Sequence, residues 1–194
     1  MKRSLSILAG AALLALTVTA CSAEPAQPTP TPAAPAVTPH TDVPILASFT
    51  ATDLEGNEID QSILEGTPLT MVNVWATYCG PCKEEMPDLA QLSKDYADDG
   101  VQILGLVSDV LNANGTVNQT QVDTAIALAE EAGVDYVNMV PSEYLTQNVL
   151  SQIYAVPTTF FVDENGNQVG SVYMGARDAE GWKEIIDSLL EVVA

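Results

Sequence analysis

Basic side chains are scarce in this sequence. Its 194 residues include six Lys and Arg against 26 Asp and Glu, which gives a formal net charge of −20 at pH 7. Binding to nucleic-acid phosphates needs clustered Lys and Arg, so nucleic acid is excluded as a partner. Anionic lipid would also repel the chain. The acidity is most simply explained by solubility in an extracellular medium.

Histidine is almost absent, and this excludes several kinds of active site. The single histidine, His40, lies in a proline-rich segment ahead of the part of the chain that can form a domain. A Ser–His–Asp triad and a Cys–His dyad therefore lack their base. A haem attachment motif would need histidine directly after the cysteine pair, where Lys83 stands. A zinc site needs four ligands, and no second cysteine pair exists to complete one. We expect no metal and no other cofactor.

The N-terminus has the pattern of an export signal. A basic tip, "MKR", precedes an uncharged apolar run from Leu5 to Ala20. The segment "VTAC" (Val18 to Cys21) resembles the lipobox of bacterial lipoproteins, which implies cleavage before Cys21 and attachment of lipid to its sulfur. A plain signal peptide and a retained membrane helix are the alternatives. All three place the following domain outside the cytoplasm.

The rest of the chain divides into a spacer and one domain. Seven of the twelve prolines lie between Ser22 and Pro44, a composition that favours extended, semi-rigid conformations. We therefore predict a signal peptide over residues 1–20, a lipidated cysteine with a tether over 21–44, and a domain over 45–194. Cleavage would remove two basic residues and no acid, leaving four basic and 26 acidic residues and a formal charge of −22.

Residues 45–194 alternate between the hydrophobic patterns of strands and helices. The alternating segment "FTATDLEGNEIDQSI" predicts a hairpin, and strands are predicted at 68–76, 101–109 and 136–140. Helices are predicted from residue 81, over 119–133 and 142–154, and in the C-terminal segment, where Asp178 is the expected N-cap. Asn165-Gly166 predicts a second hairpin with a type I′ turn. This order predicts an α/β fold with helices on both faces of a central sheet.

The cysteine pair Cys79 and Cys82 is the chemical centre of the sequence. A structural disulfide is one interpretation, but a bridge over so short a loop removes little chain entropy. The pair also follows a buried strand and begins a helix, with Pro81 suited to the first turn. Cys79 at the helix N-terminus would have a lowered thiol pKa. Cys82, one turn inside and more buried, could resolve a mixed disulfide. The setting favours a redox-active pair.

The segments "WATYCGPCKEEMP" and "AVPTTFFVDENG", with the order of strands and helices, resemble the thioredoxin superfamily. More narrowly they are similar to its membrane-tethered, extracytoplasmic branch of TlpA and ResA, from about Ile45 to the end. The resemblance implies a thioredoxin-like fold with a mixed sheet, an N-terminal β-hairpin and a helical insertion over 110–139. We assign no residue of the insertion a function. Tyr78 stands where the family commonly has Trp, and Gly80-Pro81 matches thioredoxin itself, so the redox potential cannot be copied from a relative.

The resemblance also implies roles for residues outside the cysteine pair. Pro157 matches the superfamily's cis-proline, which lies against the disulfide and leaves the backbone of Val156 free to pair with substrate. An ordinary trans-proline that opens a strand is the alternative. Trp75 matches the family tryptophan that flanks the site and shields the sulfurs, with a place in the core as the alternative. Tyr78 keeps an aromatic side chain at the rim of the site, and both residues are expected to contact substrate.

Glu85 matches an acidic residue characteristic of the ResA-like branch. Its position three residues after Cys82 places both on one helix face. There its carboxylate could raise the thiol pKa and relay a proton. The alternative is a solvated surface residue, as expected for Glu84.

Together these observations predict a lipid-anchored thiol–disulfide oxidoreductase on the outer side of a bacterial cytoplasmic membrane. The resemblance implies reduction of disulfides in exported proteins, with electrons from a membrane thiol carrier of the CcdA or DsbD type. Apocytochrome c maturation is one family role among several, and the residues do not select among them. A disulfide-forming oxidase and a redox-inert binding lipoprotein are the alternatives. We expect a monomer held at the bilayer through Cys21.

Overall fold

The computed structural model describes residues 44–46 and 48–193. The predicted signal peptide, Cys21 and all of the predicted tether except Pro44 lie outside the described residues. Within the described part, no helix is both long and apolar enough to cross a membrane.

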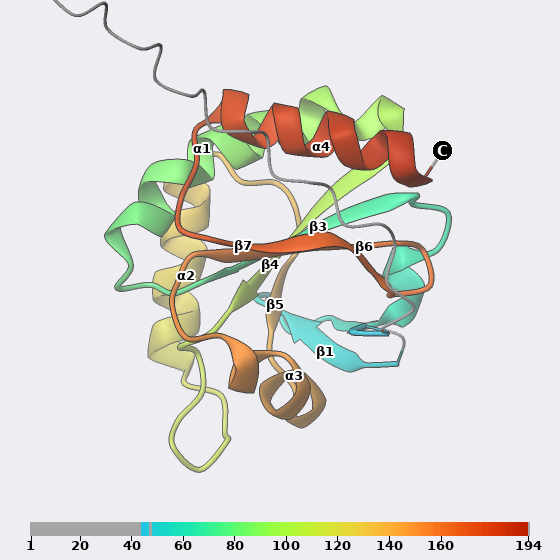
Figure 1. Cartoon of the computed structure of the whole chain (residues 1–194). Helices are drawn as coiled ribbons and strands as arrows, with labels where there is room; N and C mark the ends of the chain where they lie inside the picture. The colour runs from blue at the N-terminus through green and yellow to red at the C-terminus, as the bar shows by residue number, and fades with distance from the viewer. Residues whose placement is uncertain (1–43, 47, 194) are drawn as a thin grey trace, which may run out of the picture. The chain divides into compact units, whose positions relative to one another are not determined.

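The described residues build a seven-stranded mixed sheet with the order β2-β1-β5-β4-β3-β6-β7 (Figure 1). The central pair β3–β4 is parallel, as is β4–β5, whereas β6 runs antiparallel to β3 and forms a hairpin with β7. The strands are β1 (Thr50–Asp53), β2 (Glu58–Asp60), β3 (Leu69–Trp75), β4 (Val101–Val107), β5 (Asn138–Val140), β6 (Thr158–Val162) and β7 (Gln168–Met174). The predicted N-terminal hairpin is confirmed as β1–β2.

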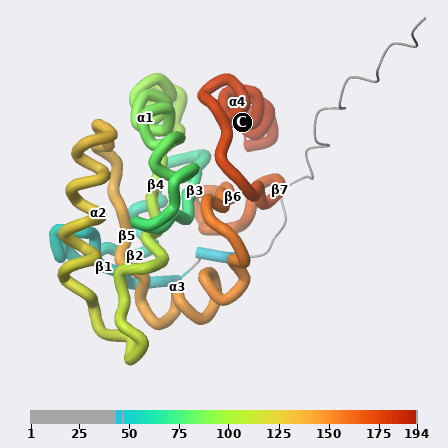
Figure 2. The backbone as a smooth tube through the Cα atoms, turned by 90° about the vertical axis from the view of Figure 1, so that its left-hand side faces the viewer, coloured from blue at the N-terminus to red at the C-terminus, as the bar shows by residue number. Residues whose placement is uncertain are grey.

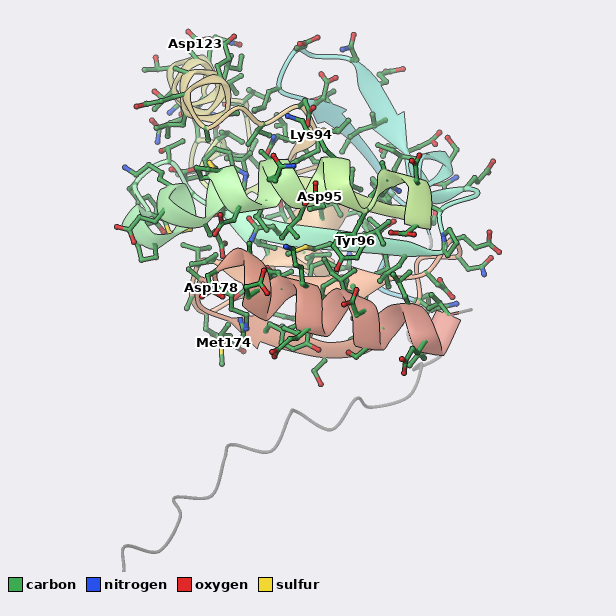
Figure 3. All side chains as sticks on the ribbon, turned by 90° about the horizontal axis from the view of Figure 1, so that it is seen from above. Lys94, Asp95, Tyr96, Asp123, Met174 and Asp178 are labelled. Atoms are coloured by element: carbon green, nitrogen blue, oxygen red, sulfur yellow. A yellow bond between two sulfur atoms is a disulfide. The ribbon has the colours of Figure 1, made fainter. Side chains whose placement is uncertain are left out.

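Helices cover both faces of this sheet, as predicted. They are α1 (Gly80–Asp95), α2 (Gln119–Glu131), α3 (Glu143–Asn148) and α4 (Ala179–Val193), with short 3-10 helices at Gln61–Leu64, Ala97–Asp99 and Leu150–Gln152. In two perpendicular views α1 and α4 lie side by side on one face, and α3 lies on the opposite face (Figures 1 and 2). From above, Tyr96 at the end of α1 lies beside α4 (Figure 3), where its hydroxyl donates to Asp187 at 2.7 Å.

Strand β3 separates the two main hydrophobic cores. All seven of its residues are buried, which explains the nearly continuous apolar run in the sequence. Leu69 and Met71 point into the core beneath α1 and α4, whereas Val72 and Val74 point into the core that includes α3. Packing on both faces therefore holds β3 up to its C-terminal end, from which the chain continues to the cysteine pair.

The predicted type I′ turn at Asn165-Gly166 is wrong, although the hairpin itself is confirmed. The turn hydrogen bond runs from Gly166 N–H to Asp163 C=O at 3.0 Å, and Asp163 N–H donates to Asn167 C=O at 2.9 Å, so the loop has three residues. Gly166 alone takes the positive φ of 76° that this loop needs. The Asp163 carboxylate accepts from Asn165 and Asn167 N–H at 2.9 and 2.8 Å, which stabilises the longer loop.

The β1–β2 hairpin uses the same arrangement. The Asp53 carboxylate accepts from Glu55 and Asn57 N–H at 2.9 and 2.8 Å, and Gly56 has a φ of 90°. Desolvation raises the pKa of the partly buried Asp53 carboxyl, but these hydrogen bonds and one from the Asn57 side chain outweigh it and lower the pKa. The pattern Asp-x-x-Gly-Asn thus closes both antiparallel hairpins of the described chain.

Gly105 in β4 leaves room for a buried hydrogen bond above the sheet. It pairs with Asn73 of β3 on one side and with Asn138 of β5 on the other. Over it, the Trp75 indole N–H donates to Asn138 Oδ1 at 2.8 Å. A Cβ at residue 105 would collide with that amide oxygen and lie 3.1 Å from the indole nitrogen. The glycine is therefore required by close approach of side chains, since its φ is not in the left-handed region.

We expect Gly105→Ala to lower the free energy of unfolding by about 2 kcal/mol, because overpacking displaces Asn138 and breaks its bond to Trp75. Urea unfolding of wild type, Gly105→Ala, Asn138→Ala and the double variant measures this. In the Asn138→Ala background the Gly105→Ala change should cost clearly less. Strictly additive losses would show that the collision with Asn138 is not the cause.

Candidate active site

The cysteine pair lies where β3 gives way to α1. Cys79 is the N-cap residue of α1, Gly80 is its first residue, and Pro81 occupies the first turn. The sulfur of Cys79 accepts a hydrogen bond from Cys82 N–H at 3.2 Å, and a disulfide joins the two cysteines. Orphan N–H groups and the helix macrodipole favour negative charge at this position. In the dithiol form they would stabilise a Cys79 thiolate.

Both cysteines are buried in one cluster, Cys82 slightly more completely than Cys79. Cys82 is 1% exposed and packs with Trp75, Met86 and Val107, whereas Cys79 is 5% exposed. The residue before the pair, Tyr78, is 74% exposed. Cys79 is thus the cysteine nearer to solvent and Cys82 the more enclosed one, as the sequence predicted.

The chain before β6 brings a free peptide group to the disulfide. The Val156–Pro157 bond is cis, as predicted. The carbonyl oxygen of Val156 lies 3.6 Å from Cys79 Sγ. Neither N–H nor C=O of Val156 has a backbone partner among the described residues. Pro157, by contrast, is held in place because its carbonyl accepts from Gly175 N–H at 2.9 Å.

Glu85 is a buried carboxyl on the inner face of α1. It is 3% exposed, so the alternative of a solvated surface residue is wrong for Glu85, while its neighbour Glu84 is exposed. Oε1 accepts from Asn73 Nδ2 at 2.9 Å, and Oε2 accepts from Arg177 N–H at 3.2 Å. These hydrogen bonds therefore connect Glu85 to β3 and to the segment before α4, and neither reaches Cys82 directly.

Burial raises the pKa of the Glu85 carboxyl above its ordinary value of 4.5, and the hydrogen bonds from Asn73 and Arg177 offset only part of this effect. The Arg177 guanidinium, which lies over the rings of Tyr173 and Trp182 at 5.2 and 5.0 Å, also lowers the pKa. So does the buried indole N–H of Trp182, although it has no hydrogen-bond partner among the described residues. Desolvation remains the largest influence, so the pKa of the Glu85 carboxyl lies above its ordinary value.

Trp75 does not lie at the rim of the site. Its side chain is fully buried, and it packs beneath the cysteines with its indole N–H bonded to Asn138. The predicted contact of Trp75 with substrate is therefore wrong, whereas its packing with the two cysteines agrees with the predicted shielding of the sulfurs. Of the two aromatic residues predicted to contact substrate, only Tyr78 is exposed.

A polar contact that sequence reasoning missed holds the loop before Cys79. The Asp109 carboxylate accepts from Thr77 N–H at 3.1 Å and from Thr77 Oγ1 at 2.6 Å. Gln121, in the first turn of α2, donates to both Thr77 Oγ1 and Asp109 Oδ2 at 3.2 and 3.3 Å. The predicted insertion thus contacts the active-site loop. Asp109 was detectable, because it closely follows β4, whose carboxyl end lies beside that of the parallel strand β3.

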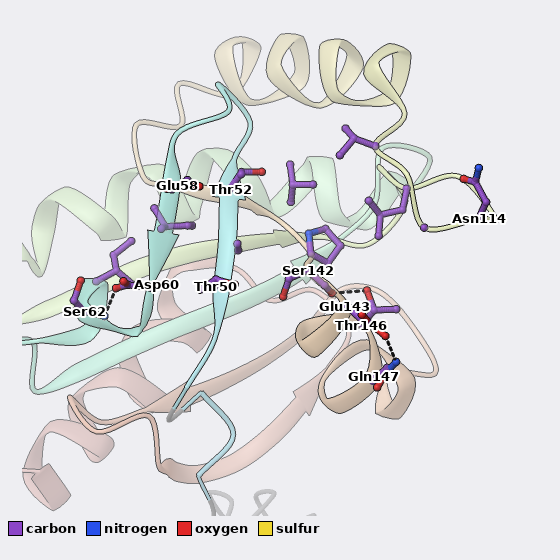
Figure 4. Close-up of a pocket in the computed structure, with 18 residues that line it drawn as sticks. Thr50, Thr52, Glu58, Asp60, Ser62, Asn114, Ser142, Glu143, Thr146 and Gln147 are labelled. Carbon is purple, nitrogen blue, oxygen red and sulfur yellow. Dashed lines mark hydrogen bonds between the residues drawn. The ribbon is translucent and has the colours of Figure 1, made fainter.

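A wide groove in the described surface lies away from the cysteine pair. This groove, of about 1260 Å³, runs between the β1–β2 hairpin, the loop 111–117 and the start of α3 (Figure 4). Its walls carry the carboxylates of Glu58, Asp60 and Glu143. None of the residues predicted for the site lines it.

Comparison with known proteins agrees with the resemblance seen in the sequence. The AhpC/TSA family matches residues 44–169. The thiol-disulfide oxidoreductase ResA of a Bacillus cereus strain is 27% identical over 146 residues, which are 75% of each protein. A thiol:disulfide interchange protein of the thioredoxin family from Chlorobium tepidum TLS is 25% identical, with a TM-score of 0.60, and the match covers 79% of this chain and 98% of that chain. A DsbF homologue from Corynebacterium diphtheriae shares the fold at 18% identity, with a TM-score of 0.58 over 79% of this chain and 88% of that chain.

The raised pKa of Glu85 predicts a pH-dependent loss of stability. A carboxyl with a higher pKa in the folded chain favours folding in its neutral form. Its contribution therefore falls as the pH rises from about 4.5 through the raised pKa. The full loss is about 1.4 kcal/mol for each unit by which the folded pKa exceeds the unfolded one. Urea unfolding of the disulfide form at stepped pH should show wild type losing stability relative to Glu85→Gln over this range.

Glu84→Gln is the matched control, because it removes an exposed carboxylate from the adjacent position of the same helix. Its difference from wild type should stay flat over the same pH steps. A flat difference for Glu85→Gln as well would mean that the Glu85 carboxyl titrates normally.

Proposed function

The chain belongs to the AhpC/TSA family of thioredoxin-like proteins, and from this premise we propose that it is a thiol–disulfide oxidoreductase. Its working group is the Cys79–Cys82 pair. One observation carries the proposal. The sulfur of Cys79 caps the N-terminus of α1 in a disulfide with Cys82, and the Val156 carbonyl lies 3.6 Å away. A disulfide that only stabilises the fold requires neither a helix N-terminus nor an unpaired peptide group beside it.

The reaction begins from the dithiol. The Cys79 thiolate attacks one sulfur of a substrate disulfide, a new S–S bond forms, and the other substrate sulfur leaves as a thiolate that takes up a proton. Cys82 then loses its proton and attacks Cys79 Sγ. This breaks the mixed disulfide, releases the second substrate thiol and forms the disulfide described above. Two electrons pass from the cysteine pair to the substrate.

Three further residues support this exchange. Val156 offers its free N–H and C=O to an extended substrate segment, and Pro157 holds that peptide group against the disulfide. Glu85 relays the proton of the Cys82 thiol through the protein interior. In support, its buried carboxyl has a raised pKa, which brings proton exchange closer to neutral pH.

The proposed direction is reduction of disulfides in exported proteins, with electrons returned by a membrane thiol carrier of the CcdA or DsbD type. We place the domain on the outer side of the membrane as a monomer, tethered through a lipidated Cys21. This placement rests on the export signal, the lipobox and the proline-rich spacer of the sequence.

We expect the wild-type chain to accelerate reduction of insulin by dithiothreitol and Cys79→Ser to lose this activity, because the variant lacks the attacking sulfur. In cells, Cys82→Ala should accumulate mixed disulfides through Cys79, since nothing resolves them. Turbidity of reduced insulin and non-reducing gels measure the two effects. Cys21→Ser is the matched control, because it removes the chain's other cysteine and should keep full activity. Equal rates for wild type and Cys79→Ser would end the proposal.

Equilibration of the same wild-type protein with glutathione tests the direction. A potential near the thioredoxin value of about −270 mV agrees with a reductase. A value near about −120 mV would instead assign the protein to disulfide formation.

The mature protein should begin at Cys21 and carry lipid on that residue. Mass spectrometry of the N-terminal peptide from membranes measures this, with Cys21→Ser as the variant that should lose both the lipid and the membrane attachment. A mature N-terminus at another residue, or an unmodified Cys21, would contradict the proposed anchor.

A further inference from the structure

A small pocket opens beside the disulfide, between two exposed tyrosines. Tyr78 and Tyr154 line it together with Leu150, Ile153, Val156 and Ser108, and its volume is about 220 Å³. We propose that this tyrosine pocket receives one large uncharged side chain, aliphatic or aromatic, of the substrate protein. That side chain belongs to a residue within two positions of the cysteine that joins Cys79. The inference rests on the proposed function and adds the sequence preference of its substrate.

The position of the pocket fixes which substrate residue can reach it. Tyr78 directly precedes Cys79, and the carbonyl of Val156, another lining residue, lies 3.6 Å from Cys79 Sγ. A substrate segment that pairs with the free peptide group of Val156 continues past the pocket as an extended strand. Since such a strand advances about 3.3 Å per residue, only residues close to the substrate cysteine can reach the pocket.

The chemistry of the lining selects an uncharged group. None of the acidic or basic residues that the structure describes lines this pocket. Leu150, Ile153 and Val156 supply aliphatic surface. The acidic groove of Figure 4, by contrast, carries three carboxylates. Desolvating a charged side chain in the uncharged pocket would be unfavourable, whereas burying an apolar one is favourable.

The exposure of the two tyrosines indicates a surface that contacts another protein. Tyr154 is 91% exposed and Tyr78 is 74% exposed, although large aromatic side chains are usually covered. Met174 is 68% exposed and pairs with Thr158, the residue after Pro157. It therefore lies at the same end of the sheet as the peptide group of Val156. Exposed tyrosines provide rigid contact area at low entropic cost, as at protein interfaces generally.

The size of the pocket fits a single side chain better than a separate ligand. Sites for small molecules and cofactors usually enclose about 300–1,000 Å³. The tyrosine pocket, at about 220 Å³, lies below that range. The occupant is therefore best explained as a side chain of a longer peptide. The mixed disulfide with Cys79 holds that peptide at the site.

The test uses the reduced full chain with Cys21→Ser and Cys82→Ala, in which Cys79 is the only thiol. Each probe is a ten-residue peptide whose single cysteine forms a mixed disulfide with 5-thio-2-nitrobenzoate. The Cys79 thiolate attacks the peptide sulfur, the aromatic thiolate leaves as a coloured product, and the peptide remains on Cys79. One series of peptides places Phe, and a matched series Ser, at each of the four positions within two residues of the cysteine.

We expect Phe to raise the second-order rate of dye release about tenfold at one of these positions, since a filled apolar pocket discriminates by about this factor. Tyr154→Ser in the same background should reduce the preference to about twofold or less, because the rate with the Phe peptide falls toward the rate with the Ser peptide. Val117→Ser is the matched control, because Val117 is an exposed apolar residue that lines the groove of Figure 4, and it should keep the preference.

The failures of the two proposals give different results. Rapid dye release without any preference for Phe, or a preference that Tyr154→Ser leaves intact, would overturn the pocket but leave the oxidoreductase in place. Dye release no faster than with a free cysteine would overturn both. Circular dichroism and urea unfolding verify that Tyr154→Ser, a change at a 91% exposed side chain, retains the fold.

Discussion

The sulfur of Cys79 takes the place that a Ser or Asp oxygen holds at most helix N-termini. Here it accepts the hydrogen bond from Cys82 N–H that such a cap provides. The same orphan N–H groups that need a cap also stabilise negative charge. Because the capping atom is also the proposed attacking atom, the start of α1 and the proposed reactivity of the thiol depend on one contact. The remaining parts of the site hold this contact at the end of a fully buried strand.

Two polar contacts, one buried and one partly buried, support that strand end. Asn138 holds the indole of Trp75 beneath the disulfide, and Gly105 makes room for this bond. Asp109 fixes the backbone of Thr77, two residues before Cys79. Each contact joins segments far apart in the chain, and each satisfies polar groups that would be costly to leave unpaired in the interior. The position of the sulfur is thereby set by several independent elements.

Local patterns in the sequence were sufficient for most of the fold and for the cysteine pair. The buried strand β3, the helix that begins within the Cys-x-x-Cys unit and the caps at Ser142 and Asp178 all follow from residue type and spacing. The resemblance to thioredoxin supplied Pro157 and Glu85, which spacing alone would not have assigned a role. The turn at Asn165-Gly166 was mistaken because the neighbouring Asp163 carboxylate stabilises a longer loop than the dipeptide prefers.

Contacts between distant segments could not be predicted in the same way. Nothing near Trp75 in the sequence shows that Asn138, 63 residues later, binds its indole and keeps it in the core. Likewise, Tyr154 meets Tyr78 at one pocket only because the chain before β6 passes the start of α1. Such pairings depend on the register of strands in three dimensions. The sequence contains the residues but not their distances.

The first described residues pair with the loop that joins β6 and β7. Pro44 bridges to Asn167, and Ile45 and Leu46 donate to Gly166 C=O at 2.9 and 3.0 Å, so the chain joins the domain at the loop that closes β6–β7. Cys79 lies at the opposite end of β6, next to Pro157. The surface around the sulfur is thus separated by the length of β6 from the residue at which the described chain begins.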